Sequence, residues 1–309
     1  MPQPVAAVSR SAGAAATARS MWTLFEPVHV VSYFTAEARR AFEQAGLRGF
    51  WRGYFAGRAA PLGEVGAAPV VAAFFSFSPA MVARALPGVW ELATPAAALA
   101  ARQAGAVAAL QRLLDEAGVG PATTAAAADR LAEAATGLDG AGRVLGASNS
   151  ALPMPEQPLA RLWHAATVLR EHRGDGHVGA LVATDLGGAE TLALRAGVDL
   201  AAGGAHSRVS GGWTREVLQP IRGWTDPEWD AAVARLADRG LLRADGLATV
   251  EGTALYRHVE DATDQAATRP WARLTAEQAA GVAELLRPIA RACAAAFPFP
   301  NPIGIPASS

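Results

Sequence analysis

The stretch 225–250 constrains the fold of this chain more than any other. Thr225 can cap a helix, and Glu228 stands at the position that completes a capping box. Apolar residues follow at helical spacing until Gly240, where a left-handed residue can end the helix. Two short apolar runs then flank the turn RADG at 243–246, and Asp-Gly favours a tight hairpin turn. A longer helical pattern comes next, so the order helix, hairpin, long helix predicts a winged helix-turn-helix with a short β wing.

The rest of the chain is predicted to be mainly α-helical. Apolar residues recur at helical spacing, with Ser or Thr before Pro as start signals and Gly or Pro as stop signals. Residues 70–77 fit either a strand or a buried helix, and 200–223 is expected to be a Gly-rich loop. Helices are expected at about 22–45, 47–59, 79–86, 95–116, 125–136, 159–173, 176–186, 189–196, 226–239, 251–268 and 276–297.

The chain is predicted to consist of two halves with a tail at each end. Three prolines between 153 and 158 mark the boundary between the halves. The sequence of 78–86 resembles that of 225–236, which predicts a tandem, pseudo-duplicated fold. The predicted segments are a disordered tail over 1–20, an N-terminal winged-helix-like half with Ala-rich connector helices over 21–150, a C-terminal winged helix-turn-helix half over 151–297, and an extended tail over 298–309.

Composition and charge narrow the class of protein. The formal net charge is −1 and all 27 basic residues are arginine, which argues against a globally basic nucleic-acid-binding protein. The single Cys293 lies in an apolar helical run and can form no internal disulfide. No apolar run approaches the roughly 18 residues of a membrane span, and residues 1–20 carry no apolar signal-peptide core. We expect a cytoplasmic protein that does not bind membranes.

One helical face of the first half combines aromatic residues with an arginine. Trp51, Tyr54, Phe55 and Arg58 share this face because their spacing is i, i+3, i+4 and i+7. An arginine over aromatic rings can bind a carboxylate or phosphate, or stack on a planar ligand. The same pattern also fits an aromatic core stripe with Arg58 reaching solvent.

An earlier helix carries a second set of polar residues, Glu26, His29 and Tyr33. His29 and Tyr33 are spaced i and i+4, and Glu26 lies one turn before His29, so all three share one helical face. They could transfer protons if they face a cavity. The alternative is a packed histidine that is hydrogen-bonded to a neighbour.

The second half concentrates His164, Glu171, His172, Asp175 and His177 on one predicted helix and at its end. Histidines with a carboxylate can hold a divalent metal, but none of the tight spacings of known zinc sites is present, so we predict no metal. A structural role, with Asp175 capping a helix, is the alternative. The letters GDGHVG match a dinucleotide-binding fingerprint, yet they follow an amphipathic helix rather than a buried strand, and we reject that interpretation.

The predicted helix at 226–239 offers little to DNA. Carboxylates dominate its first five residues, where DNA-reading helices present hydrogen-bond donors. The basic residues that could neutralise phosphates are Arg235 and Arg239 in this helix and Arg243 in the predicted wing. DNA binding is therefore doubtful.

Three segments carry a resemblance to a known family. They are FWRGYFAGRAAPLG, LREHRGDGH and the acidic segment GWTDPEW. They resemble MarR-like helix-turn-helix proteins of high-GC bacteria, and within these the SalU-type helix-turn-helix family, over about residues 22–290. The resemblance implies a winged helix-turn-helix fold with a small-molecule pocket where the two halves meet. Because MarR-type proteins are dimers, it also implies that this chain is a fused, monomeric pseudo-dimer.

We therefore predict a helix-turn-helix-fold protein of MarR-like regulator ancestry that binds a small molecule, with no cofactor. The aromatic and arginine residues of the first half and the histidines of the second would line the pocket. An enzyme of specialised metabolism is one alternative, with His29 or His177 as acid or base and Tyr54 or Arg58 stabilising an anion. A ligand-responsive regulator that binds DNA is the other.

Overall fold

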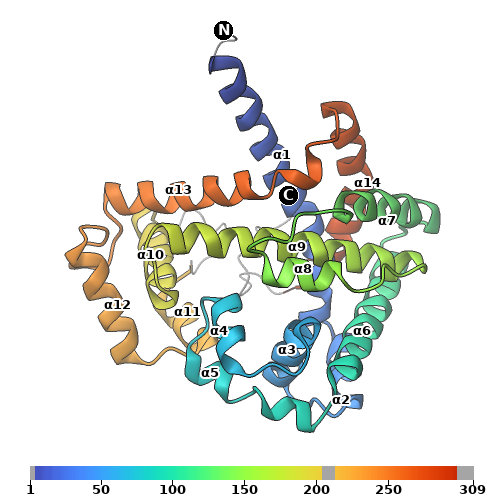
Figure 1. The fold of residues 1–309 in the computed structure, drawn as a ribbon, viewed down its shortest axis with the longest axis horizontal. Coiled ribbons are helices and arrows are strands. Elements are labelled where there is room, and N and C mark those ends of the chain that lie inside the picture. Colours follow the sequence, from blue (N-terminus) through green and yellow to red (C-terminus); the bar gives the residue numbers. More distant parts are fainter. Residues whose placement is uncertain (1–3, 204–212, 298–309) are drawn as a thin grey trace.

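A computed structural model describes residues 4–203 and 213–297 (Figure 1). Over these ranges the protein is mainly helical, and its only β pairing is one isolated bridge. The first half contains α1 (Pro4–Phe34), α2 (Ala36–Gln44), α3 (Phe50–Ala59), η1 (Ala60–Leu62), α4 (Ala67–Phe74), α5 (Pro79–Ala83), η2 (Gly88–Glu91), α6 (Pro95–Glu116), α7 (Pro121–Ala135) and α8 (Val144–Ser150). The second contains α9 (Pro158–Ala183), α10 (Gly188–Ala201), α11 (Arg215–Arg222), α12 (Asp226–Asp238), α13 (Val250–Ala266), η3 (Arg269–Trp271) and α14 (Ala276–Ala294).

Long helices from both halves form one central core. α1 packs against α14 and α9 packs against α7, while α6 and α13 each contact both α1 and α9. In Figure 1, α9 and α13 run side by side across the molecule. Buried apolar side chains such as Leu110, Leu131, Trp163 and Leu286 fill the space between these helices. The Ala-rich helices α6 and α7, expected as connectors, are therefore part of the core that the two halves share.

Each half adds a smaller core of its own. In the first half, α2 to α5 enclose a cluster that includes Leu47 and Phe55. In the second half, α10 to α12 and part of α13 enclose Leu194, Trp229 and Leu236. The two smaller cores lie on the same side of α9 and α13 (Figure 1).

The helix-turn-helix unit of the second half follows its local sequence signals. α12 begins behind Thr225, and Glu228 completes the predicted capping box. Gly240 has φ 72° after the helix, as its position predicted. The expected hairpin keeps one antiparallel bridge, between Leu242 and Ala248, before α13 begins at Val250. A two-stranded wing is thus not formed within the described residues.

Residues 4–20, for which the sequence predicted a disordered tail, form the first part of α1. Alanine favours the helix, and tertiary contacts hold its end in place. Ala18 is buried in the central core, and Arg19 pairs with Glu260 at 2.7 Å and with Asp264 at 2.5 Å. The predicted tail at 298–309 lies outside the described residues.

The prediction that α9 would break near Gly174 and restart behind Asp175 is wrong. The helix is continuous from Pro158 to Ala183. A Cβ on Gly176 would stand 2.9 Å from the Cβ of Ala266, so glycine here allows α9 to pack closely against α13. Asp175 does not begin a new helix of its own. It accepts a hydrogen bond from the backbone amide of Gly146, in the first turn of α8, at 2.7 Å.

Four other segments differ from their sequence-based predictions. The helix expected at 79–86 ends at Ala83 as α5, whereas residues 70–74 take the helical alternative left open for them, as the end of α4. The segment 137–158, expected to be a loop, contains α8. The expected loop 200–223 contains α11, and its residues 204–212 lie outside the described part. The helix expected at 22–45 is divided at Thr35, which caps α2.

Among the described helices, none combines the length and the hydropathy needed to cross a membrane.

Two glycines of α9 offer a test of its close packing. Gly176→Ala should lower the free energy of unfolding by about 1–3 kcal/mol because its Cβ would press on Ala266. Gly179→Ala should raise it by about 0.5–1 kcal/mol, because Gly179 has no atom near its Cβ position and alanine favours the helix. Urea unfolding followed by circular dichroism measures both. Effects of the same sign would contradict the packing argument.

Candidate functional site

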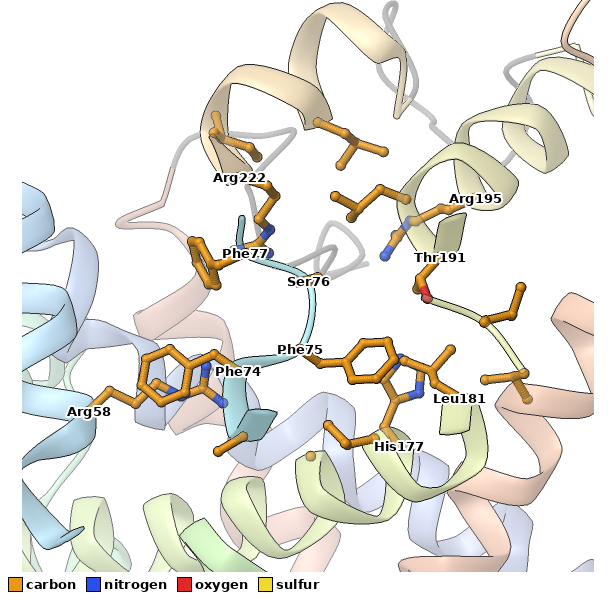
Figure 2. Close-up of a pocket in the computed structure, with 18 of the residues that line it drawn as sticks. Arg58, Phe74, Phe75, Ser76, Phe77, His177, Leu181, Thr191, Arg195 and Arg222 are labelled. Carbon is orange, nitrogen blue, oxygen red and sulfur yellow. The ribbon is translucent and has the colours of Figure 1, made fainter. Parts of the chain in front are cut away.

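A cavity of about 440 Å³ lies between the two smaller cores (Figure 2). Its walls come from the end of α1, α3, α4 and the link to α5 in the first half, and from α9, α10, α11 and α13 in the second. Aromatic side chains dominate the first-half wall, and arginines from α3, α9, α10 and α11 reach the space. The volume lies within the usual range for small-molecule sites.

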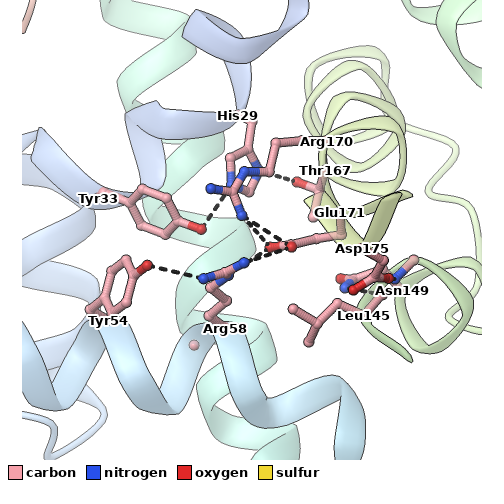
Figure 3. A network of polar contacts seen from close by, with 12 residues as sticks. His29, Tyr33, Tyr54, Arg58, Leu145, Asn149, Thr167, Arg170, Glu171 and Asp175 are labelled. Carbon is pink, nitrogen blue, oxygen red and sulfur yellow. Dashed lines mark hydrogen bonds and ion pairs between the residues drawn. The ribbon is translucent and has the colours of Figure 1, made fainter. Parts of the chain in front are cut away.

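A buried carboxylate on α9 ties the first half to the central helices (Figure 3). Arg58 donates to the two Glu171 carboxylate oxygens at 2.9 and 3.0 Å, and Arg170 donates to both at 3.0 Å. Glu171 is only 1% exposed. Burial alone would raise the pKa of Glu171, but the Arg170 and Arg58 guanidiniums hold it well below its usual range. Glu171 is therefore ionised and fully paired.

The same network continues to α1. Arg170 approaches Glu26 at 3.4 Å, and the Glu26 carboxylate also accepts a hydrogen bond from the Trp22 indole at 3.0 Å. Glu26 is 2% exposed and lies behind the cavity wall. The Glu26 carboxylate thus balances part of the positive charge of Arg170.

His29 and Tyr33 form a hydrogen-bonded chain whose proton positions follow from the contacts. The Thr167 hydroxyl donates to the Trp163 carbonyl at 2.9 Å, so it must accept from Nδ1–H of His29, also at 2.9 Å. Nε2 of His29 then accepts the Tyr33 hydroxyl proton at 2.8 Å. Burial, reinforced by the Arg170 cation, lowers the pKa of His29 well below its ordinary value, in agreement with a neutral ring.

The structure places five of the sequence-predicted residues on the cavity wall. They are Tyr33, Trp51, Tyr54, Arg58 and His177. Tyr54 accepts a hydrogen bond from Arg58 at 3.2 Å, and His177 is hydrogen-bonded through Nδ1 to Thr263 at 2.9 Å. Residues far apart in the chain thus meet in one space.

The other predicted residues lie away from the cavity. His29 is buried behind Tyr33, and Phe55 belongs to the core of the first half. His164, His172 and Asp175 are buried on other faces of α9.

Helix geometry explains why the histidines separate. Five residues turn a helix by about 140°, so His172 and His177 cannot share one face. The His172 carbonyl accepts a hydrogen bond from Arg143 on the side of α8, opposite to the cavity. Burial lowers the pKa of His164, beside the Arg102 cation, to about 4. Within the residues described, no three His, Cys, Asp or Glu side chains are placed to hold a metal ion.

Sequence reasoning missed the arginines at the far end of the cavity. Arg195 comes from α10 and Arg222 from α11, a helix that was expected to be loop. Each stacks on an aromatic ring, Arg195 on Trp213 at 4.7 Å and Arg222 on Phe77 at 4.4 Å. Isolated arginines in a sequence give no signal of such stacking, because the rings are contributed by other segments.

The link between α4 and α5 crosses the cavity in a strained conformation. Phe75 has φ 56° and ψ −58°, and the Ser76 amide donates to the Phe74 carbonyl at 2.7 Å, which defines a γ-turn. A non-glycine residue in this region is strained and persists only where its surroundings hold it. The Phe75 carbonyl packs against Gly188, where a Cβ would approach to 2.4 Å. Phe75 lies in the middle of the cavity in Figure 2.

The same link is bonded to the turn between α11 and α12. The Trp224 indole donates to the Ser76 carbonyl at 2.9 Å, and the Ser78 amide donates to the Arg222 carbonyl at 2.8 Å. The first half therefore holds the helix-turn-helix of the second half by direct hydrogen bonds.

The three arginines considered for DNA contact have partners within the chain. Arg235 pairs with Glu190 at 2.5 Å, and Arg243 pairs with Asp245 at 2.6 Å. Arg239 donates to the backbone carbonyls at 185 and 184, at 2.6 and 3.1 Å. These guanidiniums stabilise the fold around α12.

Comparison with known proteins places the chain in one family. Residues 18–300 match the model of the helix-turn-helix family, so the chain belongs to that family. No curated protein and no solved structure matches it.

The buried ion pairs of Glu171 should be important for stability. Glu171→Gln should lower the free energy of unfolding by about 3–5 kcal/mol, because it leaves buried guanidiniums without their countercharge. The matched control is Glu133→Gln, which removes an exposed pair with Arg130 and should cost less than about 0.5 kcal/mol. Chemical denaturation compares the two. Equal losses would show that the buried pairs do not hold the halves together.

Proposed function

We propose that this protein binds a small molecule in the cavity between its two smaller cores. The cavity itself supports the proposal most directly. Protein interiors are close-packed and contain few voids larger than a water molecule, so a space of about 440 Å³ needs an explanation. Its aromatic wall and its inward-facing arginines are the side chains that recognise planar and polar parts of a ligand.

The ionisable groups favour binding over catalysis. General acid–base catalysis works best with a pKa near the operating pH. Burial lowers the pKa of His177 to about 4 and that of His29 well below its ordinary value. Burial also raises the pKa of Tyr33. All three groups are therefore neutral near pH 7 and are poor proton carriers, which makes the enzyme the weaker alternative.

We also propose that the two halves arose by duplication of a MarR-like winged helix-turn-helix unit, of the SalU type. The packing supports this. α1 and α9 each pack against the last long helix of the other half, α14 and α7, and α6 and α13 bridge both in the same way. This exchange is the arrangement expected of a dimer whose two subunits have been fused. A single chain would then be the functional unit.

A ligand-responsive DNA-binding regulator is the second candidate, because the chain belongs to the helix-turn-helix family. The geometry of α12 weighs against it. The partners of Arg235 and Arg239 withdraw them from phosphate contacts. In the first half, α5 is a helix of only five residues, which is too short to act as a second recognition helix.

A cavity-filling variant tests ligand binding. Compounds that raise the melting temperature of the wild-type protein should fail to raise that of Ala73→Trp, because Ala73 lines the cavity. A ligand at about 100 times its Kd should stabilise the wild type by about 2.7 kcal/mol. Thermal-shift measurements on a compound collection, with mass spectrometry of molecules that co-purify, provide the readout.

The control for that experiment is Ala100→Trp, on an exposed position of α6. It should respond to each compound as the wild type does. Stabilisation that persists in Ala73→Trp would place binding outside the cavity and contradict the proposal.

DNA binding should be weak. We expect a Kd of roughly 10⁻⁴–10⁻⁶ M at physiological salt, as for non-specific contacts, because the α12 arginines are held by partners and its first turn carries Asp226 and Glu228. A mobility-shift assay on the DNA upstream of the protein's own gene, at two salt concentrations, measures it. A nanomolar complex that is lost in Arg235→Ala would support the regulator instead.

A further inference from the structure

Positive charge exceeds negative charge on the cavity wall. Four arginines line the cavity, Arg58, Arg170, Arg195 and Arg222, against one carboxylate, that of Glu260. The Glu260 carboxylate is also bound to a guanidinium outside the cavity, at 2.7 Å. An enclosed site with this balance attracts anions.

The charges are balanced at one end of the cavity. Arg58 and Arg170 share Glu171, and Arg170 also lies near Glu26. Two guanidiniums therefore face two buried carboxylates. This end presents neutral hydrogen-bonding groups, among them the Tyr54 hydroxyl that accepts from Arg58.

The opposite end, formed by α10 and α11, differs. Arg195 makes no ion pair with any residue in the described ranges, and its buried Nε has no hydrogen-bond partner there. A buried donor without a partner is costly, more so when it is charged. The Arg195 guanidinium stacks on the Trp213 ring, which orients it but accepts no hydrogen bond from its N–H groups.

Arg222 faces the same space from α11. Figure 2 shows Arg195 reaching into the upper part of the cavity from α10, and the Arg222 guanidinium on the other side of that space, beside Phe77. Burial is the main cause that lowers the pKa of Arg222 to about 10, and the cations of Arg58, Arg170 and Arg195 add to it. Cations placed in one enclosed space favour an anion between them.

Apolar and aromatic side chains separate the two ends. Phe75 and Leu181 lie in this middle section of the wall (Figure 2). They suit a flat, apolar body and offer no partner to a second charge.

From this arrangement we infer that the ligand is an aromatic organic acid. Its anionic group binds Arg195, and its body lies along Phe75 towards Tyr54. The inference rests on the proposed function, since it names the ligand class of the same cavity. It adds a charge and an orientation that the existence of a cavity does not require.

Two fluorescent probes that share one aromatic scaffold distinguish the contribution of a ligand's negative charge from that of its aromatic body. 8-Anilinonaphthalene-1-sulfonate is an aromatic acid, and N-phenyl-1-naphthylamine is the same body without the sulfonate. The acid should bind the wild-type protein more tightly. Arg195→Gln should weaken the binding of the acidic probe by roughly ten- to hundred-fold, which is the effect of losing one charge-assisted hydrogen bond. The affinity for the neutral probe should stay nearly unchanged. Fluorescence titration measures all four dissociation constants.

Further variants keep the test decisive if Arg195→Gln folds poorly. Thr191→Glu places a carboxylate on the cavity wall near Arg195 and should repel the acid, while Thr191→Gln, of equal size, should not. Arg243→Gln, which removes an exposed arginine outside the cavity, should bind both probes as the wild type does.

The possible outcomes distinguish a failure of the aromatic-acid inference from a failure of the proposed small-molecule binding. If both probes bind equally and neither responds to Arg195→Gln or Thr191→Glu, the acid inference is overturned and the cavity remains a ligand site. If neither probe binds saturably, or if Ala73→Trp leaves both affinities unchanged, the proposed function itself fails. Weaker binding of the acid alone, in both variants, supports the inference.

Discussion

The ionised Glu171 carboxylate, enclosed by Arg58 and Arg170, is the interaction on which the rest of this structure depends. Burying three charges is favourable only when each one finds its partners at once, and here the partners come from α3 and α9. The network therefore fixes the aromatic wall of the first half at a set position against α9. Arg170 extends the constraint to α1 through Glu26. α3 and α9, joined by this ion pair, form one part of the cavity wall, and α10 and α11 form another.

The elements that the sequence predicted well are those whose signals are local. The capping box at Thr225 marks the start of α12, and the helix expected from 276 begins there as α14. The predictions that were wrong concern elements decided by tertiary contacts. α9 continues through Gly176, where it packs closely against α13, and Arg19 holds the first part of α1 in place by binding carboxylates on α13. The alanines of 4–20 favour a helix locally, but nothing near Gly176 or Arg19 in the sequence shows these partners.

In the candidate site, too, local sequence spacing grouped some residues, while contacts between distant segments could not be predicted. Helical spacing grouped Trp51, Tyr54, Phe55 and Arg58, and the structure places three of them on the cavity wall and Phe55 in the core beside it. Pairing across the chain could not be predicted, since Arg58 and its carboxylate are 113 residues apart. Arg195 and Arg222 were missed for the related reason that their neighbours come from other helices. Sequence spacing thus identifies a functional face, and the fold decides what that face meets.

The helix-turn-helix of the second half is built into the wall of the cavity. The strained link at Phe75 packs against α10, and its neighbours Ser76 and Ser78 hold the turn between α11 and α12 by hydrogen bonds. A molecule that displaces Phe75 would therefore act directly on that turn. The arginines of α12 are meanwhile used to hold the unit onto α10 and the end of α9. Under the proposed function, the helix-turn-helix of the second half therefore forms part of the wall of the ligand site, and an effect of the ligand on that unit would pass through the 74–78 link.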